Sequence, residues 1–249
     1  MKVEDWQEVV AQLEAFAKPF KETLVESAQR RHLVESIAGL LSTLERKTSE
    51  GIAYLHGQDR KQLQQFIGES PWEPAPLLEV LTRQICAQIR EPDGVIVLDP
   101  SAFAKKGTKS VGVARQWSGR LGKVDNCQVG VYLGYVSRRE QALANLRLYL
   151  PQEWTQDRKR CRAAGVPKHV KFQTRHAQAL DMLDESGPLL PHSWIAGDDE
   201  MGRCGPFREE LRARDERYLL AVPSWTRRRR RSSICKVRRY AMVSPRIVN

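Results

Sequence analysis

The spacing of apolar residues changes near Gly94, and this change constrains the fold more than any other feature of the chain. Before that point, apolar residues such as Val9, Leu13 and Phe16 recur every three or four positions, a period typical of amphipathic helices. After it they occur in short runs rich in Val, Tyr and Leu, which indicate β-strands. We therefore expect an α-helical domain over residues 1–92 and an α/β domain over residues 93–224.

The helical part carries several boundary signals. Pro19 lies inside the first long periodic stretch and should dent that helix. Asp59 is expected to cap a helix over the sequence DRKQLQQFIG, and Gly68 is expected to end it. A group of prolines follows, and the amphipathic stretch over residues 77–89 predicts one more helix after that turn.

The α/β part predicts five strands with helices between the later ones. Short, polar links between the first two strands permit an antiparallel meander, and helices are expected between the third and fourth strands and between the fourth and fifth. This order is typical of a ribonuclease H-like fold with a mixed sheet, although many small α/β folds give a similar order. The segments expected to form strands are 95–98, 127–136, 145–150, 193–197 and 217–222.

The charge balance favours a polyanionic partner. The chain has 41 lysines and arginines against 30 aspartates and glutamates, a formal charge of +11, and nucleic acid leads the partners that such a balance attracts. No apolar run approaches the ~20 residues of a membrane helix, and the acidic N-terminus lacks the apolar core of a signal peptide, so we expect a cytoplasmic protein. The five scattered cysteines predict reduced thiols rather than disulfides or zinc ligands.

Two aspartates follow strands that should be neighbours. In the expected strand order the first and fourth strands lie side by side, so Asp99 and Asp198 would meet at one end of the sheet. Two clustered carboxylates repel each other unless a cation lies between them, and hard oxygen ligands suit Mg²⁺ or Mn²⁺. Either residue could instead be an ordinary turn former or helix cap. Composition cannot choose between Asp198 and its acidic neighbours Asp199 and Glu200.

The stretch SAFAKKGTKSVGVARQWSGRLGKVDNCQVGVYLGY, which starts at Ser101, resembles the first catalytic block of IS701-type transposases in the IS4-like DDE superfamily. The resemblance extends to ERKTSEGIA, to GQDRKQLQQFIGESPW and to LRLYLPQEW, and it covers most of residues 30–222. It implies an enzyme that cuts and joins DNA with a ribonuclease H-like core and three acidic metal ligands. The implied partners are transposon ends and target DNA, with a homodimer on DNA as one arrangement.

Position by position, the resemblance places Asp99 on the first catalytic aspartate and Asp198, in AGDDEMG, on the second. Met201 stands where the family commonly has an aromatic residue, whereas Gly202 is retained. The third acid of the family lies well beyond the fifth strand, and we find no match for it here. We therefore expect an incomplete catalytic core in a truncated or frameshifted copy, or alternatively a catalytically inactive DNA-binding remnant. A standalone ribonuclease H-like nuclease is a third hypothesis.

Basic residues around the first hairpin are candidates for holding DNA phosphates beside the metal edge, the competing interpretation being an ordinary solvated loop. Trp117, in the same region, is expected to pack rather than to stack on a base. Residues 225–249, with their run of arginines, are expected to form a basic, disordered tail. The candidate DNA-binding residues are Lys105, Lys106, Lys109, Arg115, Arg120 and Lys123.

Overall fold

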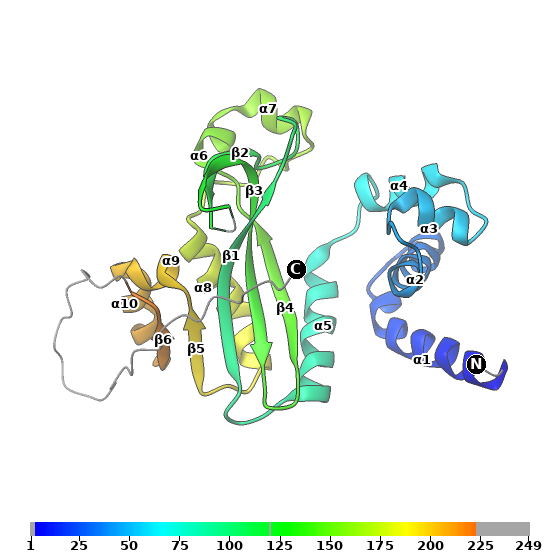
Figure 1. The fold of residues 1–249 in the computed structure, drawn as a ribbon, viewed down its shortest axis with the longest axis horizontal. Helices are drawn as coiled ribbons and strands as arrows, with labels where there is room; N and C mark the ends of the chain where they lie inside the picture. The colour runs from blue at the N-terminus through cyan, green and yellow to red at the C-terminus, as the bar shows by residue number, and fades with distance from the viewer. Residues whose placement is uncertain (1–2, 120, 223–249) are drawn as a thin grey trace, which may run out of the picture.

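The computed structural model describes residues 3–119 and 121–222, and helices occupy its N-terminal part up to residue 89 (Figure 1). The Asp59 side chain accepts a hydrogen bond from the backbone N–H of Lys61 at 2.9 Å, which confirms the predicted cap. That helix ends at Gly68 as predicted, and Pro19 lies inside the first helix. The N-terminal helices are α1 (Val3–Glu22), α2 (Ser27–Leu41), α3 (Ser49–Leu55), α4 (Arg60–Gly68) and α5 (Pro74–Ile89).

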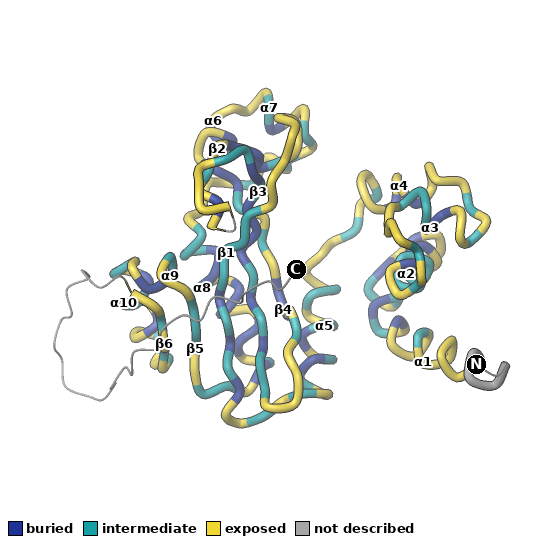
Figure 2. The backbone as a smooth tube through the Cα atoms, viewed as in Figure 1, coloured by how far each residue is buried: buried dark blue, intermediate teal, exposed yellow. Residues whose placement is uncertain are grey.

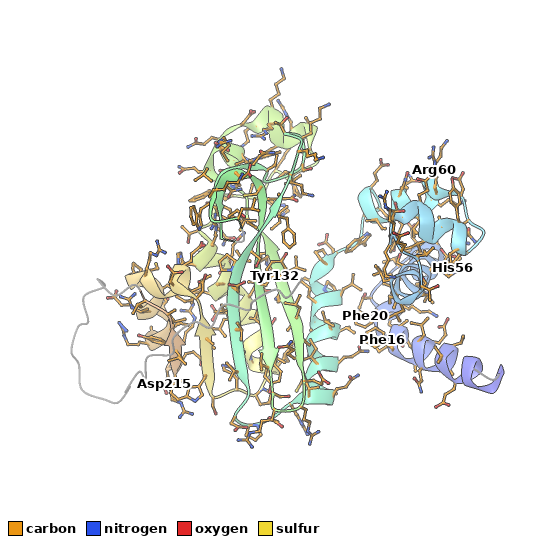
Figure 3. The ribbon with its side chains drawn as sticks, viewed as in Figure 1. Phe16, Phe20, His56, Arg60, Tyr132 and Asp215 are labelled. Carbon is orange, nitrogen blue, oxygen red and sulfur yellow. The ribbon has the colours of Figure 1, made fainter. Side chains whose placement is uncertain are left out.

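Helices α2 to α4 have a small core of their own. Ile52 and Ala53 from α3 are buried there against Leu63 and Phe66 from α4. Helix α5 packs instead along the sheet, and it meets α1 through a hydrogen bond from the Gln84 side chain to the Phe16 carbonyl at 3.1 Å. Figure 3 shows Phe16 and Phe20 on the part of α1 that approaches α5. The helical region is thus linked to the sheet mainly through α5.

A mixed six-stranded sheet follows the helices, and it confirms the predicted ribonuclease H-like α/β fold class. The path runs β2-β3-β1-β5-β6, with β4 also paired to β3. The β1, β2 and β4 pairings with β3 are antiparallel, whereas β1–β5 and β5–β6 are parallel. The strands are β1 (Val95–Ala104), β2 (Ala114–Ser118), β3 (Lys123–Val136), β4 (Gln141–Leu148), β5 (Trp194–Gly197) and β6 (Tyr218–Leu220).

The sequence prediction was wrong about the first hairpin. β1 does not end at Leu98 but continues to Ala104, because it pairs with β3 over its whole length, from Val95 opposite Val136 to Ala104 opposite Cys127. β3 also begins earlier than expected, at Lys123, and its first residues pair with β2. The link between them contains β2, a strand that the sequence did not predict. Residues 225–249, including the run of arginines, lie outside the described residues.

One face of the sheet carries the main core. Ile96 and Leu98 of β1 and Leu133 of β3 are fully buried against Met182 and Leu183 of α8 (Arg175–Ser186), which lies behind the strands in Figure 1. Each such side chain stabilises the fold by about 1.5–3 kcal/mol. Alternation along the strands sends the intervening residues to the opposite face, where Figure 2 shows intermediate and exposed positions.

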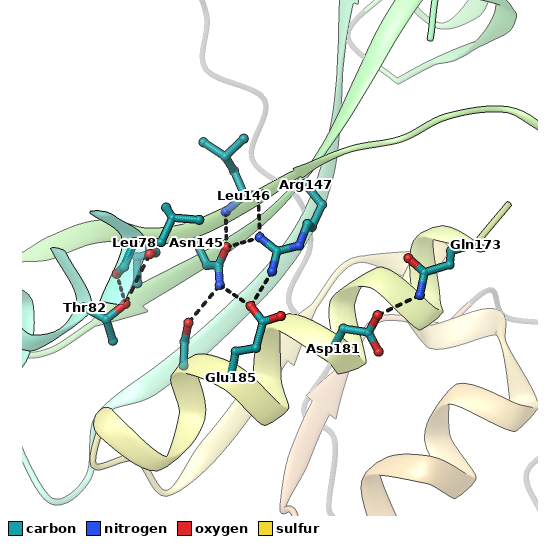
Figure 4. Close-up of polar contacts among 10 residues, drawn as sticks. Leu78, Thr82, Asn145, Leu146, Arg147, Gln173, Asp181 and Glu185 are labelled. Atoms are coloured by element: carbon teal, nitrogen blue, oxygen red, sulfur yellow. Dashed lines mark hydrogen bonds and ion pairs between the residues drawn. The ribbon is translucent and has the colours of Figure 1, made fainter. Parts of the chain in front are cut away.

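Polar contacts attach β4 to the helices on either side of it (Figure 4). Thr82 of α5 donates to the carbonyl of Ala144 at 3.3 Å, and Asn145 donates to the hydroxyl of Ser186 on α8 at 3.0 Å. Arg147 pairs with Glu185, also on α8. Asn145 is buried, so its hydrogen bonds avoid the cost of an unsatisfied amide in the core.

A small lobe stands at the far end of the hairpin, above β2 in Figure 1. It combines the loop before β2 with α6 (Gln152–Gln156) and α7 (Arg158–Ala163). Val113, Leu150, Trp154 and Cys161 are buried together in its own core. The chain then passes through α8, a 3₁₀ turn (Gly187–Leu189), β5, α9 (Asp199–Arg203), α10 (Gly205–Ala213) and β6.

Candidate functional site

The pairing of β1 with β5 brings the two predicted carboxylates to one place. The parallel register ends with Leu98 opposite Gly197, so Asp99 and Asp198 each follow the last paired residue. Asp99 does not end its strand, because β1 continues, but β5 stops at Gly197 and leaves that edge of β1 open. Asp99 lies opposite Tyr132 of β3 on the face away from the main core, and Figure 3 labels Tyr132 near the middle of the sheet.

Asp99 has an unusual environment for a carboxylate. Burial raises the pKa of Asp99 above its ordinary value, and the nearby negative charges of Asp198 and Glu200 raise it further. The Ser101 hydroxyl opposes this shift by donating a hydrogen bond to Asp99 Oδ2 at 3.0 Å. A cation beside Asp99 would relieve both the burial and the repulsion.

Asp198 is at the same time a helix cap. Its Oδ1 accepts a hydrogen bond from the backbone N–H of Met201 at 3.1 Å, which starts α9 directly after β5. The interpretation as a cap is therefore correct, but capping occupies one oxygen and the residue is exposed, so the carboxylate still faces outward. Met201, which replaces the family's aromatic residue, is fully buried in the main core.

A hollow of about 790 Å³ adjoins Asp198. Asp99 does not line it, since Pro100 and Ala102 of β1 do so from the face opposite to Asp99. The two carboxylates thus stand at a rim, with Asp198 on the side of the hollow. The lining residues are Pro100, Ala102, Trp117, Gly119, Val129, Arg175, His176, Asp198, Asp199, Glu200 and Arg203.

Arg175 is the site residue that the sequence did not reveal. From the start of α8 its guanidinium pairs with Glu200 at 2.7 Å, donates to the Gln116 side chain of β2 at 3.3 Å and lies 4.7 Å from the ring centroid of Tyr149. His176 contacts the Glu200 carbonyl through Nε2 at 3.1 Å. One arginine thereby connects β2, α8 and α9, the helix that Asp198 caps. No local motif surrounds Arg175, so only the spatial neighbours identify it.

The prediction that Trp117 packs was wrong. Its side chain on β2 is 55% exposed and lines the hollow. An exposed indole beside a cavity is available for stacking on an aromatic ring. This exposure could not be predicted from local sequence, because β2 itself was not predicted.

The candidate DNA-binding residues that the structure describes are dispersed along the first hairpin. Lys105 follows β1, and six residues at about 3.3 Å each separate it from Asp99 by roughly 20 Å. Because β1 is longer than expected, Lys105 stands farther from Asp99 than the sequence suggested, whereas the role of the six cations in DNA binding stays a prediction. Lys106 and Lys109 are exposed in the same loop and Arg115 is exposed on β2. Lys123 pairs with Asp125 at 3.0 Å, and Arg120 lies outside the described residues.

The rest of the described chain adds no alternative centre. Cys86, Cys127, Cys161 and Cys204 are free thiols, and Cys235 lies beyond residue 222. Within residues 3–119 and 121–222, no three His, Cys, Asp or Glu side chains converge as a metal-binding group. No helix in these ranges is long and apolar enough to cross a membrane.

Comparison with known proteins places the chain in a family. The chain is 36% identical over 94 residues to a protein of Microchaete diplosiphon described as a probable transposase for insertion sequence element IS701. That match covers 37% of this chain, and the chain spans about a quarter of the relative's length, 25%. The family model described as DDE superfamily endonuclease matches residues 19–238, which is most of the chain. The chain therefore belongs to the DDE superfamily endonucleases.

Proposed function

We propose that this protein is an insertion-sequence transposase that cleaves DNA at transposon ends and joins the new 3′ end to target DNA. The observation that supports this most strongly is the convergence of Asp99 and Asp198 beside the last paired residues of β1 and β5. Family membership and the similarity to the IS701 relative support the same reaction. In this proposal residues 1–92 recognise DNA and residues 93–224 form the catalytic core.

The carboxylate pair fits a divalent metal ion. Mg²⁺ commonly uses one or two carboxylates, retains several waters and takes further oxygens from substrate phosphates, so a pair suffices to hold it against DNA. A Mg²⁺ or Mn²⁺ ion at Asp99 and Asp198 would polarise the phosphodiester and activate water or a 3′-hydroxyl. The raised pKa of Asp99 favours such binding, because a cation stabilises its ionised form.

The other residues of the site position the substrate and the acids. Arg175 restrains Glu200 and with it the start of α9, so it keeps Asp198 close to Asp99. Trp117 offers an aromatic surface at the edge of the hollow, where a nucleotide base could stack. Arg203 also lines the hollow and pairs with Asp199.

A second candidate is a DNA-binding remnant without chemistry. It is favoured by the lack of any group of three convergent acids among the described residues. Glu209 and Glu210 lie on α10 between β5 and β6, and Glu210 pairs with Arg214. Glu200, whose charge acts on Asp99, is itself held by Arg175.

One experiment separates the two. The full chain is incubated in Mg²⁺ with a duplex carrying the DNA that flanks its coding sequence, and nicks are mapped on both strands. We expect nicks at the element ends that disappear in EDTA and in Asp99→Asn. Asp199→Asn is the matched control, since Asp199 is an adjacent exposed acid outside the pair, and it should retain nicking.

The outcomes are distinct. End-specific binding without metal-dependent nicks would select the remnant. Nicking at random positions would point to a standalone nuclease. Equal loss of nicking in Asp99→Asn and Asp199→Asn would refute the assignment of the carboxylate pair.

A further inference from the structure

The positive charge of the folded chain is concentrated in one place. Nine of the 41 lysines and arginines and none of the 30 acids lie in residues 223–249, which leaves 32 against 30 in residues 1–222. Residues 105–115 and 152–171, here called the basic lobe, hold ten cations against two acids, Glu153 and Asp157. The remainder of residues 1–222 therefore has 22 cations against 28 acids and a charge of −6. A polyanion is attracted to the lobe and repelled elsewhere.

The basic lobe is held together by packing and hydrogen bonds and is not a loose charged loop. Trp154 on α6 is fully buried, and its indole Nε1 donates to the carbonyl of Val113 at 2.8 Å. The Arg160 guanidinium stacks on the Trp154 ring at 3.7 Å and donates to the carbonyls of Thr108 and Val113 at 2.9 and 3.2 Å. These contacts fix α7 against the loop after β1, so the cations of both segments share one rigid support.

Exposed cations surround a second hollow on this lobe. Its volume is about 280 Å³, and Arg158, Arg162 and Lys168 line it together with Cys161 and Val166. None of the three cations forms an ion pair with a carboxylate in the described part of the chain. The nearby carboxylate of Asp157 is engaged in capping α7, where its Oδ1 accepts from the Arg160 N–H. Three cations around one concavity can donate hydrogen bonds to the anionic oxygens of a phosphate group.

The chain that follows the first segment of the lobe leads to the carboxylate site. Trp117 and Gly119, at the end of β2, line the large hollow beside Asp198, and Gln116 of the same strand contacts Arg175. Lys105 lies roughly 20 Å from Asp99 along β1. At about 3.4 Å per base pair, a duplex passing from the carboxylates to the lobe would span roughly six base pairs.

We propose that the basic lobe binds the phosphodiester backbone of duplex DNA, with its near end at Lys105 about six base pairs from the scissile bond and with a phosphate in the hollow between Arg158, Arg162 and Lys168. This inference rests on the proposed function for its substrate. It extends the DNA contacts beyond the hairpin lysines to α7 and the loop that follows it. Arg160 has a different role, since it holds the lobe together.

The test measures how the binding constant for a fluorescent duplex depends on salt between 50 and 300 mM KCl, a range in which phosphate contacts dominate the salt dependence of binding. The full chain is compared with Arg158→Gln/Arg162→Gln/Lys168→Gln. The control, Arg90→Gln/Arg138→Gln/Arg139→Gln, removes the same charge from exposed residues at the opposite end of β1. The nine cations of residues 223–249 are present in all three proteins and cancel in the comparison.

We expect the lobe variant to lower the slope of log K against log[KCl] by about 2–3, since each lost phosphate contact contributes about 0.9. The control should change it by less than about 1. A circular dichroism melt establishes that both variants are folded. Lys168→Gln/Lys171→Gln, in the exposed loop after α7, is a second variant that should lower the slope without touching the helix.

The failure of this proposal is distinguishable from that of the proposed function. Equal slopes for the lobe and control variants, with metal-dependent nicking intact in the wild type, overturn the lobe assignment alone. A lobe-dependent slope without nicking upholds the lobe and refutes the chemistry. Absence of duplex binding in the wild type overturns both.

Discussion

Replacing Gly202 with alanine should separate α9 from β6 and move Asp198 away from Asp99. A Cβ built on Gly202 would lie 1.7 Å from the carbonyl oxygen of Ala221 and 2.7 Å from its carbonyl carbon. Real Cβ atoms essentially never come within 3.0 Å of another heavy atom, so the two segments must part by at least 1.3 Å, the difference between 3.0 and 1.7. Backbone cannot rotate away as a flexible side chain could.

The displacement should reduce both stability and activity. Overpacking of this kind typically costs about 1–3 kcal/mol. For a chain of this size each kcal/mol lowers Tm by roughly 2–4 °C, so Tm should fall by about 2–12 °C. Asp198 starts the five-residue helix that contains Gly202, and a shift near 1 Å at a reacting group costs about 100-fold in rate. Nicking should fall by a factor of that order at temperatures where the variant is folded.

The assay pairs thermal denaturation with the nicking reaction. Gly68→Ala is the matched control, because Gly68 also lies in a helix, has no heavy atom within 4 Å of its built Cβ, and should tolerate or gain from the added methyl group. If Gly202→Ala keeps the wild-type Tm and nicking rate, or if both glycine variants lose Tm equally, the close contact of α9 with Ala221 does not position Asp198.

Three further outcomes follow from the contacts described above. Arg160→Ala should lower Tm and make the basic lobe sensitive to proteolysis, because Arg160 stacks on Trp154 and bonds the loop after β1. Arg162→Ala, at an exposed neighbour, should do neither; equal protease sensitivity of the two variants would contradict the role of Arg160 in holding the lobe together. Asp99→Asn should raise Tm in EDTA at pH 7, because burial raises the pKa of Asp99 and its ionised form destabilises the fold; a lower Tm in EDTA would contradict this destabilisation. The same substitution should abolish any increase in Tm caused by Mg²⁺. The pairing with Arg214 lowers the pKa of Asp184 below its ordinary 3.8. The ionised Asp184 therefore stabilises the fold fully above pH 3.8, and this stabilisation is lost as the pH falls through the lowered pKa. In urea unfolding, the free energies of unfolding of Asp184→Asn and wild type should differ at neutral pH and converge in that acid range.

Much of the outline could be predicted because it depends on neighbouring residues. The helical period, the Asp59 cap and the end of α4 at Gly68 are local features, and all three are present in the structure. The adjacency of the first and fourth strands was also predictable, since the element order implies it and the sheet confirms it. The identities of Asp99 and Asp198 as candidates came from that adjacency and from the family resemblance.

Long-range pairing decided the rest. β1 extends to Ala104 because fourteen-residue β3 provides a partner along its full length, and no property of residues 99–104 alone announces this. The same pairing carried Lys105 away from the carboxylates and placed Trp117 on an unforeseen strand. Arg175 reaches Glu200 across 25 positions of sequence. Local sequence determined most of the helices, five of the strands and the acids that this protein offers. Only the tertiary structure decided the presence of β2 and the lengths and neighbours of the strands, because strand pairing and ion pairing depend on residues that are distant along the chain.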